Sequence, residues 1–384
     1  MQKNEDSILL SVWFKSKKIS ALLKIANELY RQKKYNSAIK YYRRILKIDP
    51  VHFAAQANLA TSLFECENFS DSISELKQVI KIDSINPWWY NYLSQAYQKT
   101  GDYILALEAG MQAVLLSNGD DNHHLNMAYT IYEISDVKGV DFIASYLQNW
   151  SEKYPDNAIV KQCFKSFYFD KNFTRSEPEY VEKLFDVFAE DFDEVLSDLE
   201  YDSPSILAQK IAQFCADQRQ EKIRILDLGC GSGLCGENIK KNMPNCHLTG
   251  VDISSQMLHV AASKKIYNKF VKCDIVNCFD SINCCYDVIV SADVFTYFGD
   301  LDYLFKSISD NLSDDGVFAF TISCNNTNKE DYFLMPSSRF VHNIKYIEKL
   351  LKKHQFSIVE NEEKILRKEG EKNVNGRVVL AIKT

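Results

Sequence analysis

Four acidic residues stand where predicted strands end, and the first of them precedes a run rich in glycine. Residues 225–236, ILDLGCGSGLCG, hold four of the chain's 13 glycines. The acids are Asp227, Asp252, Asp274 and Asp293. Glycine permits positive φ and lets a ligand approach bare backbone. Because the carboxyl ends of parallel strands meet at one edge of a sheet, we expect these groups to surround one binding site.

The glycine pattern alone does not decide whether the site binds a dinucleotide or a cofactor of another class. Gly229, Gly231 and Gly233 form G-x-G-x-G. Gly236 completes a looser match to the G-x-G-x-x-G turn that holds a dinucleotide's pyrophosphate. Asp252 closes the next predicted strand, where a carboxylate accepts ribose hydroxyls in either case.

The end of the third predicted strand argues against a dinucleotide. It ends at Cys273, Asp274 and Ile275, which offer a carboxylate and a backbone amide where an adenine would lie. A dinucleotide fold has no standard use for that pair. Acids at the ends of all four strands also suit a cationic ligand and repel a pyrophosphate.

The second half of the chain predicts an α/β domain with a mostly parallel sheet. Apolar strands at 222–228, 247–253, 286–293 and 317–323 alternate with helical segments. Two further strands near the C-terminus are joined by a short turn. Because strands in a hairpin run in opposite directions, one of them must be antiparallel to the rest.

The first half repeats itself with a period of 34 residues. Ile25, Leu59 and Leu93 correspond, and small residues recur at Ala26, Ala60 and Ser94. This period is typical of tetratricopeptide repeats, in which two antiparallel helices form each unit. The expected units are 19–52, 53–86, 87–120 and a degenerate 121–154, followed by a capping helix at 157–170. Such an array offers a docking groove for a protein or peptide, or serves as a lid or a homodimerisation module.

Composition excludes several classes of protein. Apolar content is 46% and charged content 25%, as in globular proteins. No apolar run approaches the roughly 20 residues that span a bilayer, so no membrane association is expected. Eleven scattered cysteines indicate a reducing, cytoplasmic setting without a metal site. Residues 1–50 carry a net charge of +8 and the remainder -15, which argues against a nucleic-acid substrate.

With these motifs in view, residues 180–384 resemble a class I S-adenosylmethionine-dependent methyltransferase. DLGCGSG, GVDIS, CDI and YDVIVSADVFTY resemble its first four motifs. The whole chain resembles bacterial predicted methyltransferases that carry tetratricopeptide repeats. In the segment where that group has a pattern near SGRYAHS, this chain keeps Arg339 and His342 but has Ser338, Phe340 and Val341 instead of glycine, tyrosine and alanine.

The resemblance implies two domains and a cofactor. An all-α repeat solenoid is expected at 1–172, and a Rossmann-like, seven-stranded methyltransferase domain at 178–384. The implied cofactor is S-adenosylmethionine. Its binding residues would be Asp227 for the ammonium, Gly229, Gly231 and Gly233 under the methionine part, Asp252 for the ribose, Asp274 and Ile275 for the adenine edge, Ile253 and Met257 against the ring, and Asp293 at the fourth strand end.

Methyl transfer from a sulfonium requires mainly alignment of the acceptor and exclusion of water. A base is needed only when the acceptor must lose a proton. The candidates are His342, Tyr297 and Asp293, and Arg339 is expected to hold a carboxylate or phosphate.

No motif in the sequence identifies the methyl acceptor. The fourth motif reads SADV, unlike the (N/D)PP(Y/F) of amino-methylating nucleic-acid enzymes. We expect a small molecule first and a protein recruited by the repeats second. A scaffold with a non-catalytic cofactor domain is the third hypothesis.

Overall fold

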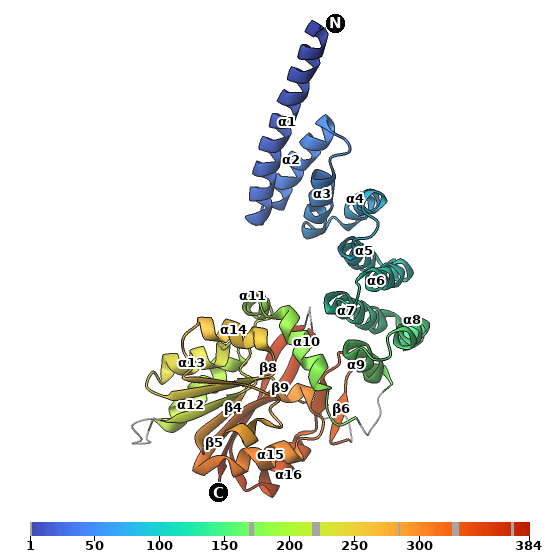
Figure 1. The fold of residues 1–384 in the computed structure, drawn as a ribbon. Coiled ribbons are helices and arrows are strands. Elements are labelled where there is room, and N and C mark those ends of the chain that lie inside the picture. Colours follow the sequence, from blue (N-terminus) through green and yellow to red (C-terminus); the bar gives the residue numbers. More distant parts are fainter. Residues whose placement is uncertain (1, 169–172, 217–222, 283–284, 325–329, 370–371) are drawn as a thin grey trace. The chain divides into compact units, whose positions relative to one another are not determined.

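The computed structural model describes residues 2–168, 173–216, 223–282, 285–324, 330–369 and 372–384. The chain divides into two compact units, Met1–Tyr154 and Pro155–Thr384 (Figure 1). The helices of the first unit are α1 (Gln2–Arg31), α2 (Tyr35–Ile48), α3 (Phe53–Glu65), α4 (Phe69–Ile82), α5 (Pro87–Thr100), α6 (Tyr103–Leu116), α7 (Asp121–Lys138) and α8 (Val140–Lys153). In the part of the chain so described, no helix is both long and apolar enough to cross a bilayer.

The first unit is a row of helix pairs, as the 34-residue period predicts (Figure 1). Small residues lie where paired helices cross: Ser72 Oγ donates to the Ala60 carbonyl at 2.8 Å, and Ser94 Oγ donates to the Ala106 carbonyl at 2.7 Å. Helix α1 begins at Gln2, 17 residues before the expected start of the first unit at residue 19. No glycine or proline interrupts residues 2–31, so nothing in the sequence ends the helix earlier.

Helix α9 (Ala158–Phe167) belongs to the second unit, whereas residues 157–170 were expected to cap the repeats. The fully buried Gln162 donates from Nε2 to Ser176 Oγ at 3.0 Å and to the Ser338 carbonyl at 3.3 Å. Ser166 Oγ donates to the Pro336 carbonyl at 3.2 Å. These bonds attach α9 to a turn far along the chain. The expected domain boundary at residue 172 lies outside the described residues.

The second unit contains a seven-stranded sheet in the order β3-β2-β1-β4-β5-β9-β8, in which β9 alone runs antiparallel (Figure 1). This confirms the predicted fold class, a repeat-containing helical region followed by a Rossmann-like sheet. Its elements are α10 (Pro178–Phe188), α11 (Phe192–Asp198), α12 (Ser203–Cys215), β1 (Arg224–Leu228), α13 (Leu234–Asn242), β2 (His247–Asp252), α14 (Ser255–Ser263), β3 (Lys269–Lys272), η1 (Cys278–Ser281), β4 (Tyr286–Ser291), η2 (Phe295–Tyr297), α15 (Asp302–Asp310), β5 (Leu312–Ser323), β6 (Tyr332–Leu334), β7 (Phe340–His342), α16 (Ile344–Lys353), β8 (Phe356–Glu369) and β9 (Lys372–Lys383).

The order of the strands opens a crevice between β1 and β4. β1 pairs in parallel with both β2 and β4, so the chain moves outward from β1 in both directions. Since crossovers between parallel strands are right-handed, helices on the two sides of β1 cover opposite faces of the sheet. The carboxyl ends of β1 and β4 therefore lie uncovered at the point where the strand order reverses, which is where such sheets bind ligands.

A small second sheet, β6–β7, was not predicted. The two strands are three residues each and pair antiparallel around a turn in which Met335 N donates to the Arg339 carbonyl at 2.8 Å. Ser338 takes a left-handed φ of +62° in this turn. Strands this short carry too few residues for an alternating apolar pattern.

We expect residues 155–384 to fold alone and α9 to be part of that fold. A fragment that starts at residue 178 should melt roughly 10 °C or more below one that starts at residue 155, because it loses several buried apolar side chains. Differential scanning calorimetry of the two fragments and the full chain measures this. Equal melting temperatures for the two fragments would contradict the assignment of α9 to the second unit.

Candidate active site

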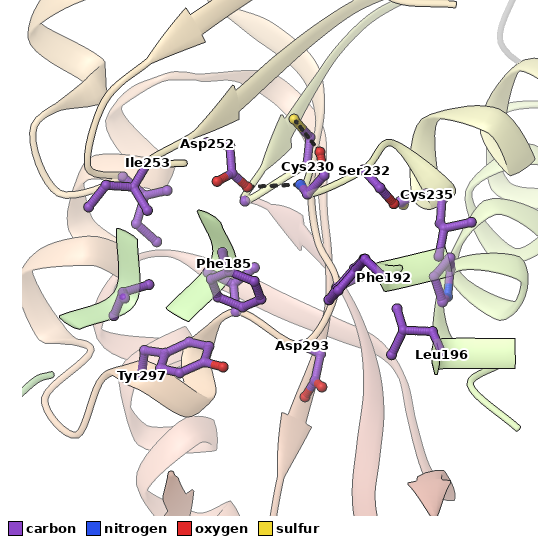
Figure 2. Close-up of a pocket in the computed structure, with 18 of the residues that line it drawn as sticks. Phe185, Phe192, Leu196, Cys230, Ser232, Cys235, Asp252, Ile253, Asp293 and Tyr297 are labelled. Carbon is purple, nitrogen blue, oxygen red and sulfur yellow. Dashed lines mark hydrogen bonds between the residues drawn. The ribbon is translucent and has the colours of Figure 1, made fainter. Parts of the chain in front are cut away.

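A pocket opens at the carboxyl ends of β1, β2 and β4 (Figure 2). It encloses about 1100 Å³, open solvent at its mouth included. Phe185, Phe192, Asp252, Asp293 and Tyr297 lie around this space in Figure 2. An apolar wall with a few convergent polar groups is typical of small-molecule sites.

The turn after β1 is fixed by hydrogen bonds to the end of β2. Gly229 N and Cys230 N both donate to the Val251 carbonyl, at 2.8 and 2.9 Å. Gly229 has φ +70°, and a Cβ at that position would overlap the side chain of Val294. Gly231 is different, since a Cβ there would meet only the ring of Phe192, at 3.7 Å. Gly231 is therefore a glycine whose bare backbone faces the pocket.

Gly233 packs against other parts of the domain. It is not among the residues of the pocket wall, so its predicted place under the methionine part of the cofactor stays a prediction. A Cβ at Gly233 would lie 3.1 Å from the ring of Tyr267 and 3.3 Å from Cβ of Ala261. The glycine makes room on the side of the turn away from the pocket.

Asp252 lies on the pocket wall, where it was predicted. Its Oδ2 accepts from Gly231 N at 2.8 Å and its Oδ1 from Ser254 N at 2.9 Å. The residue is 7% exposed. Burial raises the pKa of this carboxyl to about 6, and the backbone amides that donate to it act in the opposite direction.

Asp227 is not on the wall but lies beneath the turn, 1% exposed. Tyr267 donates its hydroxyl to Oδ2 at 2.7 Å, while Oδ1 has no hydrogen-bond partner among the described residues. Burial raises the pKa of Asp227 to about 7. A buried carboxylate with one unsatisfied oxygen is costly, and a cationic ligand group would offset that cost.

Asp274 is on the wall and is already paired. Arg175 donates from Nη2 to its Oδ2 at 2.6 Å, and Val276 N donates to Oδ1 at 3.1 Å. The Arg175 guanidinium also lies over the ring of Phe298, 4.9 Å from its centroid. Of the neighbours expected at the adenine, Ile253 and Ile275 line the pocket, whereas Met257 is fully buried elsewhere.

Asp293 contacts an arginine that the sequence did not single out. Arg367 of β8 donates from Nη1 to Asp293 Oδ2 at 2.5 Å and is 3% exposed. A register shift in the β8–β9 pairing lies between Ile365 and Arg367. Asp293 itself has a left-handed φ of +59° and donates its amide to Thr321 Oγ1 at 2.8 Å.

Three of the four residues predicted to act in methyl transfer reach the pocket: Asp293, Tyr297 and Arg339. Tyr297 and Arg339 lie on its wall, and the Tyr297 ring packs edge-on against Phe185 with centroids 5.5 Å apart. His342 does not lie on the wall. It is 1% exposed, its Nε2 donates to the Gly299 carbonyl at 3.2 Å, and burial lowers its pKa to about 4. A neutral imidazole turned toward the backbone of another segment is not placed to take a proton from a molecule in the pocket.

Helices α10 and α11 are attached to the ligand-facing turns by two aspartates. Asp186 accepts from Ser254 Oγ at 2.6 Å. Asp193 accepts from Lys264 Nζ at 2.6 Å and from the Ser232 hydroxyl of the glycine turn. Phe185 and Phe192 are thereby held over the pocket as an apolar cover.

Comparison with known proteins finds one matching stretch in each unit. Residues 226–318 match a family model described as a methyltransferase domain, and residues 19–50 match one described as a tetratricopeptide repeat. The methyltransferase resemblance and the repeat prediction are confirmed over these residues.

Several curated relatives are malonyl-[acyl-carrier protein] O-methyltransferases. The one from Bacillus anthracis is 28% identical over 37% of this chain and 51% of its own. The one from Priestia megaterium is 32% identical over 33% of this chain and 46% of its own. The chain thus spans about half the length of these relatives. A solved S-adenosylmethionine-dependent methyltransferase from Clostridium acetobutylicum is 23% identical, with a TM-score of 0.39, over 52% of this chain and 99% of that one.

The buried Asp227 predicts how stability changes with pH. Folding raises the pKa of this carboxyl to about 7, so the ligand-free folded state gains stability when it is protonated and loses it as pH rises toward 7. At pH 8 the free energy of unfolding of the Asp227→Asn variant should be roughly 2–4 kcal/mol higher than that of the wild type. This gain in stability should vanish near pH 4. Urea unfolding across this pH range measures the difference.

The matched control is Asp156→Asn, because the Asp156 side chain is fully exposed. Its stability should differ from that of the wild type by less than about 0.5 kcal/mol at any pH. A gain for Asp227→Asn that does not change with pH would contradict a raised pKa at this carboxyl.

Proposed function

We propose that the second unit transfers a methyl group from S-adenosylmethionine to a small acceptor bound in the same pocket. The observation that carries the proposal is the pair of buried carboxylates, Asp227 and Asp252, on the two sides of the glycine turn. The turn lies where the strand order reverses, and the methyltransferase model matches this part of the chain.

The described residues fit this cofactor. The unpartnered Oδ1 of Asp227 suits a buried ammonium group, and the pocket-facing carboxylate of Asp252 suits the two ribose hydroxyls. Ile253 and Ile275 give apolar walls for an adenine. We propose that the adenine amine shares Asp274 with Arg175, whose ion pair holds that carboxylate in place.

The bound cofactor would supply a methyl group already activated by its sulfonium. The chain's own part is to align the acceptor and to exclude water. Phe185 and Phe192 cover the pocket, and Tyr297 and Asp293 line the same pocket. An acceptor that is ionised at neutral pH needs no base, so the placement of His342 off the wall is consistent with this reaction.

We propose a carboxylate as the acceptor group. The two curated relatives described above are named for O-methylation of malonyl-[acyl-carrier protein], although they are matched over about half their length. Arg339 lies on the pocket wall of this chain, and an arginine binds a carboxylate with two parallel hydrogen bonds.

The tetratricopeptide match favours a second possibility for the acceptor. We propose that the first unit binds a protein or peptide, and that this partner is either a carrier of the acceptor or the acceptor itself. Methyl transfer by the full chain and by residues 155–384 would separate these cases, because only a protein-borne acceptor needs the first unit.

Calorimetric titration with S-adenosylmethionine tests the cofactor, and transfer of a labelled methyl group to a panel of small carboxylic acids tests the acceptor. We expect micromolar binding by the full chain and a loss of at least tenfold in affinity in Asp252→Ala, because two ribose hydroxyls lose their acceptor. The exposed Asp156→Ala serves as the matched control and should bind like the wild type. Folded protein that does not bind the cofactor would refute the proposed function.

A further inference from the structure

Tyr267 lies between α14 and β3, outside every sequence motif. It is not on the pocket wall, and the loop that carries it turns at Lys265, which has φ +56°. Its ring packs against Phe270 with centroids 4.8 Å apart. The hydroxyl nevertheless ends under the glycine turn, on Asp227.

Three glycines from three separate elements form the slot that admits this ring. A Cβ at Gly236 of α13 would overlap the Tyr267 hydroxyl. A Cβ at Gly250 of β2 would lie 3.0 Å from the ring, and one at Gly233 of the turn would lie 3.1 Å from it. Two of the four glycines that cluster at residues 229–236 therefore make room for a tyrosine.

The slot leads to a carboxylate with one oxygen that no described residue hydrogen-bonds. Tyr267 donates to Asp227 Oδ2 at 2.7 Å, and Oδ1 is buried without a hydrogen-bond partner in the described chain. The titratable groups that act on Asp227, or on which it acts, are Tyr267, Asp252, Cys230, Cys235 and Tyr201, and no cation is among these described groups. Four of them, Asp252, Cys230, Cys235 and Tyr201, line the pocket, so the carboxylate lies just behind its wall.

We infer that Tyr267 is a positioning residue of the cofactor site: its hydroxyl, held in the three-glycine slot, fixes one oxygen of Asp227 and leaves the other for the ammonium group of the ligand. This inference rests on the proposed function.

The geometry gives the tyrosine two effects on the carboxylate. A hydroxyl donor stabilises the ionised form of a buried acid, which is the form that attracts an ammonium group. The close walls of the slot also fix the ring, so the hydrogen bond sets the rotation of the Asp227 side chain before a ligand arrives. Preorganisation of this kind lowers the entropic cost of binding.

The test compares Tyr267→Phe with the wild type for two ligands. S-Adenosylhomocysteine carries the amino-acid ammonium, and 5′-methylthioadenosine keeps the adenosine and the sulfur but lacks the amino-acid part. Phenylalanine keeps the ring in the slot and removes only the hydroxyl. We expect affinity for S-adenosylhomocysteine to fall about tenfold at pH 7.5 and affinity for 5′-methylthioadenosine to stay within about twofold.

The pH dependence gives a readout that a loss of packing would not produce. Binding of S-adenosylhomocysteine requires ionised Asp227, so affinity should fall as pH drops through about 7 in the wild type. Removal of the hydroxyl removes a group that lowers this pKa, so the fall should begin at a higher pH in Tyr267→Phe. A pH profile that does not move would overturn the inference.

Asp227→Asn completes a double-mutant cycle. If Tyr267 acts through Asp227, the phenylalanine substitution should cause no further loss of affinity in the asparagine background. Equal and additive losses in both backgrounds would overturn the inference. If the wild type binds both ligands and Tyr267→Phe binds them equally well, the inference fails and the proposed function stands. If folded wild type binds neither ligand, the proposed function fails.

Discussion

The site depends on the hydrogen bonds that tie the turn after β1 to the end of β2. Gly229 N and Cys230 N donate to the Val251 carbonyl, and Gly231 N donates to the carboxylate of Asp252. These bonds bring glycine backbone beside a buried acid. A change that moved the turn away from β2 would displace both the wall of the pocket and the carboxylate expected to bind the ribose.

The turn has two sides with different requirements. On the pocket side Gly231 leaves backbone bare beneath Phe192, and α10–α11 are held above it through Asp186 and Asp193. On the far side the turn closes over Tyr267 and Asp227. The cluster of glycines thus leaves bare backbone at the pocket and also makes room for Tyr267. These two requirements explain why this stretch holds so many of the few glycines in the chain.

The fold and the acidic residues of the site follow from local patterns. Asp252 closes β2 and Asp274 lies two residues past the end of β3, and both reach the pocket because the alternation of elements predicts the places of these strands in the sheet. Arg175, Arg367 and Tyr267 could not be predicted in this way, since each reaches the site from a segment distant in sequence. His342, a residue shared with a family pattern, lies in a two-stranded sheet where its ring faces the backbone of another segment, and local patterns do not predict that placement.

A crystal structure of the full chain with S-adenosylhomocysteine tests the central claim most directly. The account predicts that the ribose hydroxyls bond to Asp252 and the amino group to Oδ1 of Asp227, with the Tyr267 hydroxyl still on Oδ2. A ligand that lies across the glycine turn with its amino group on another acid, or one bound away from this turn, would contradict the account.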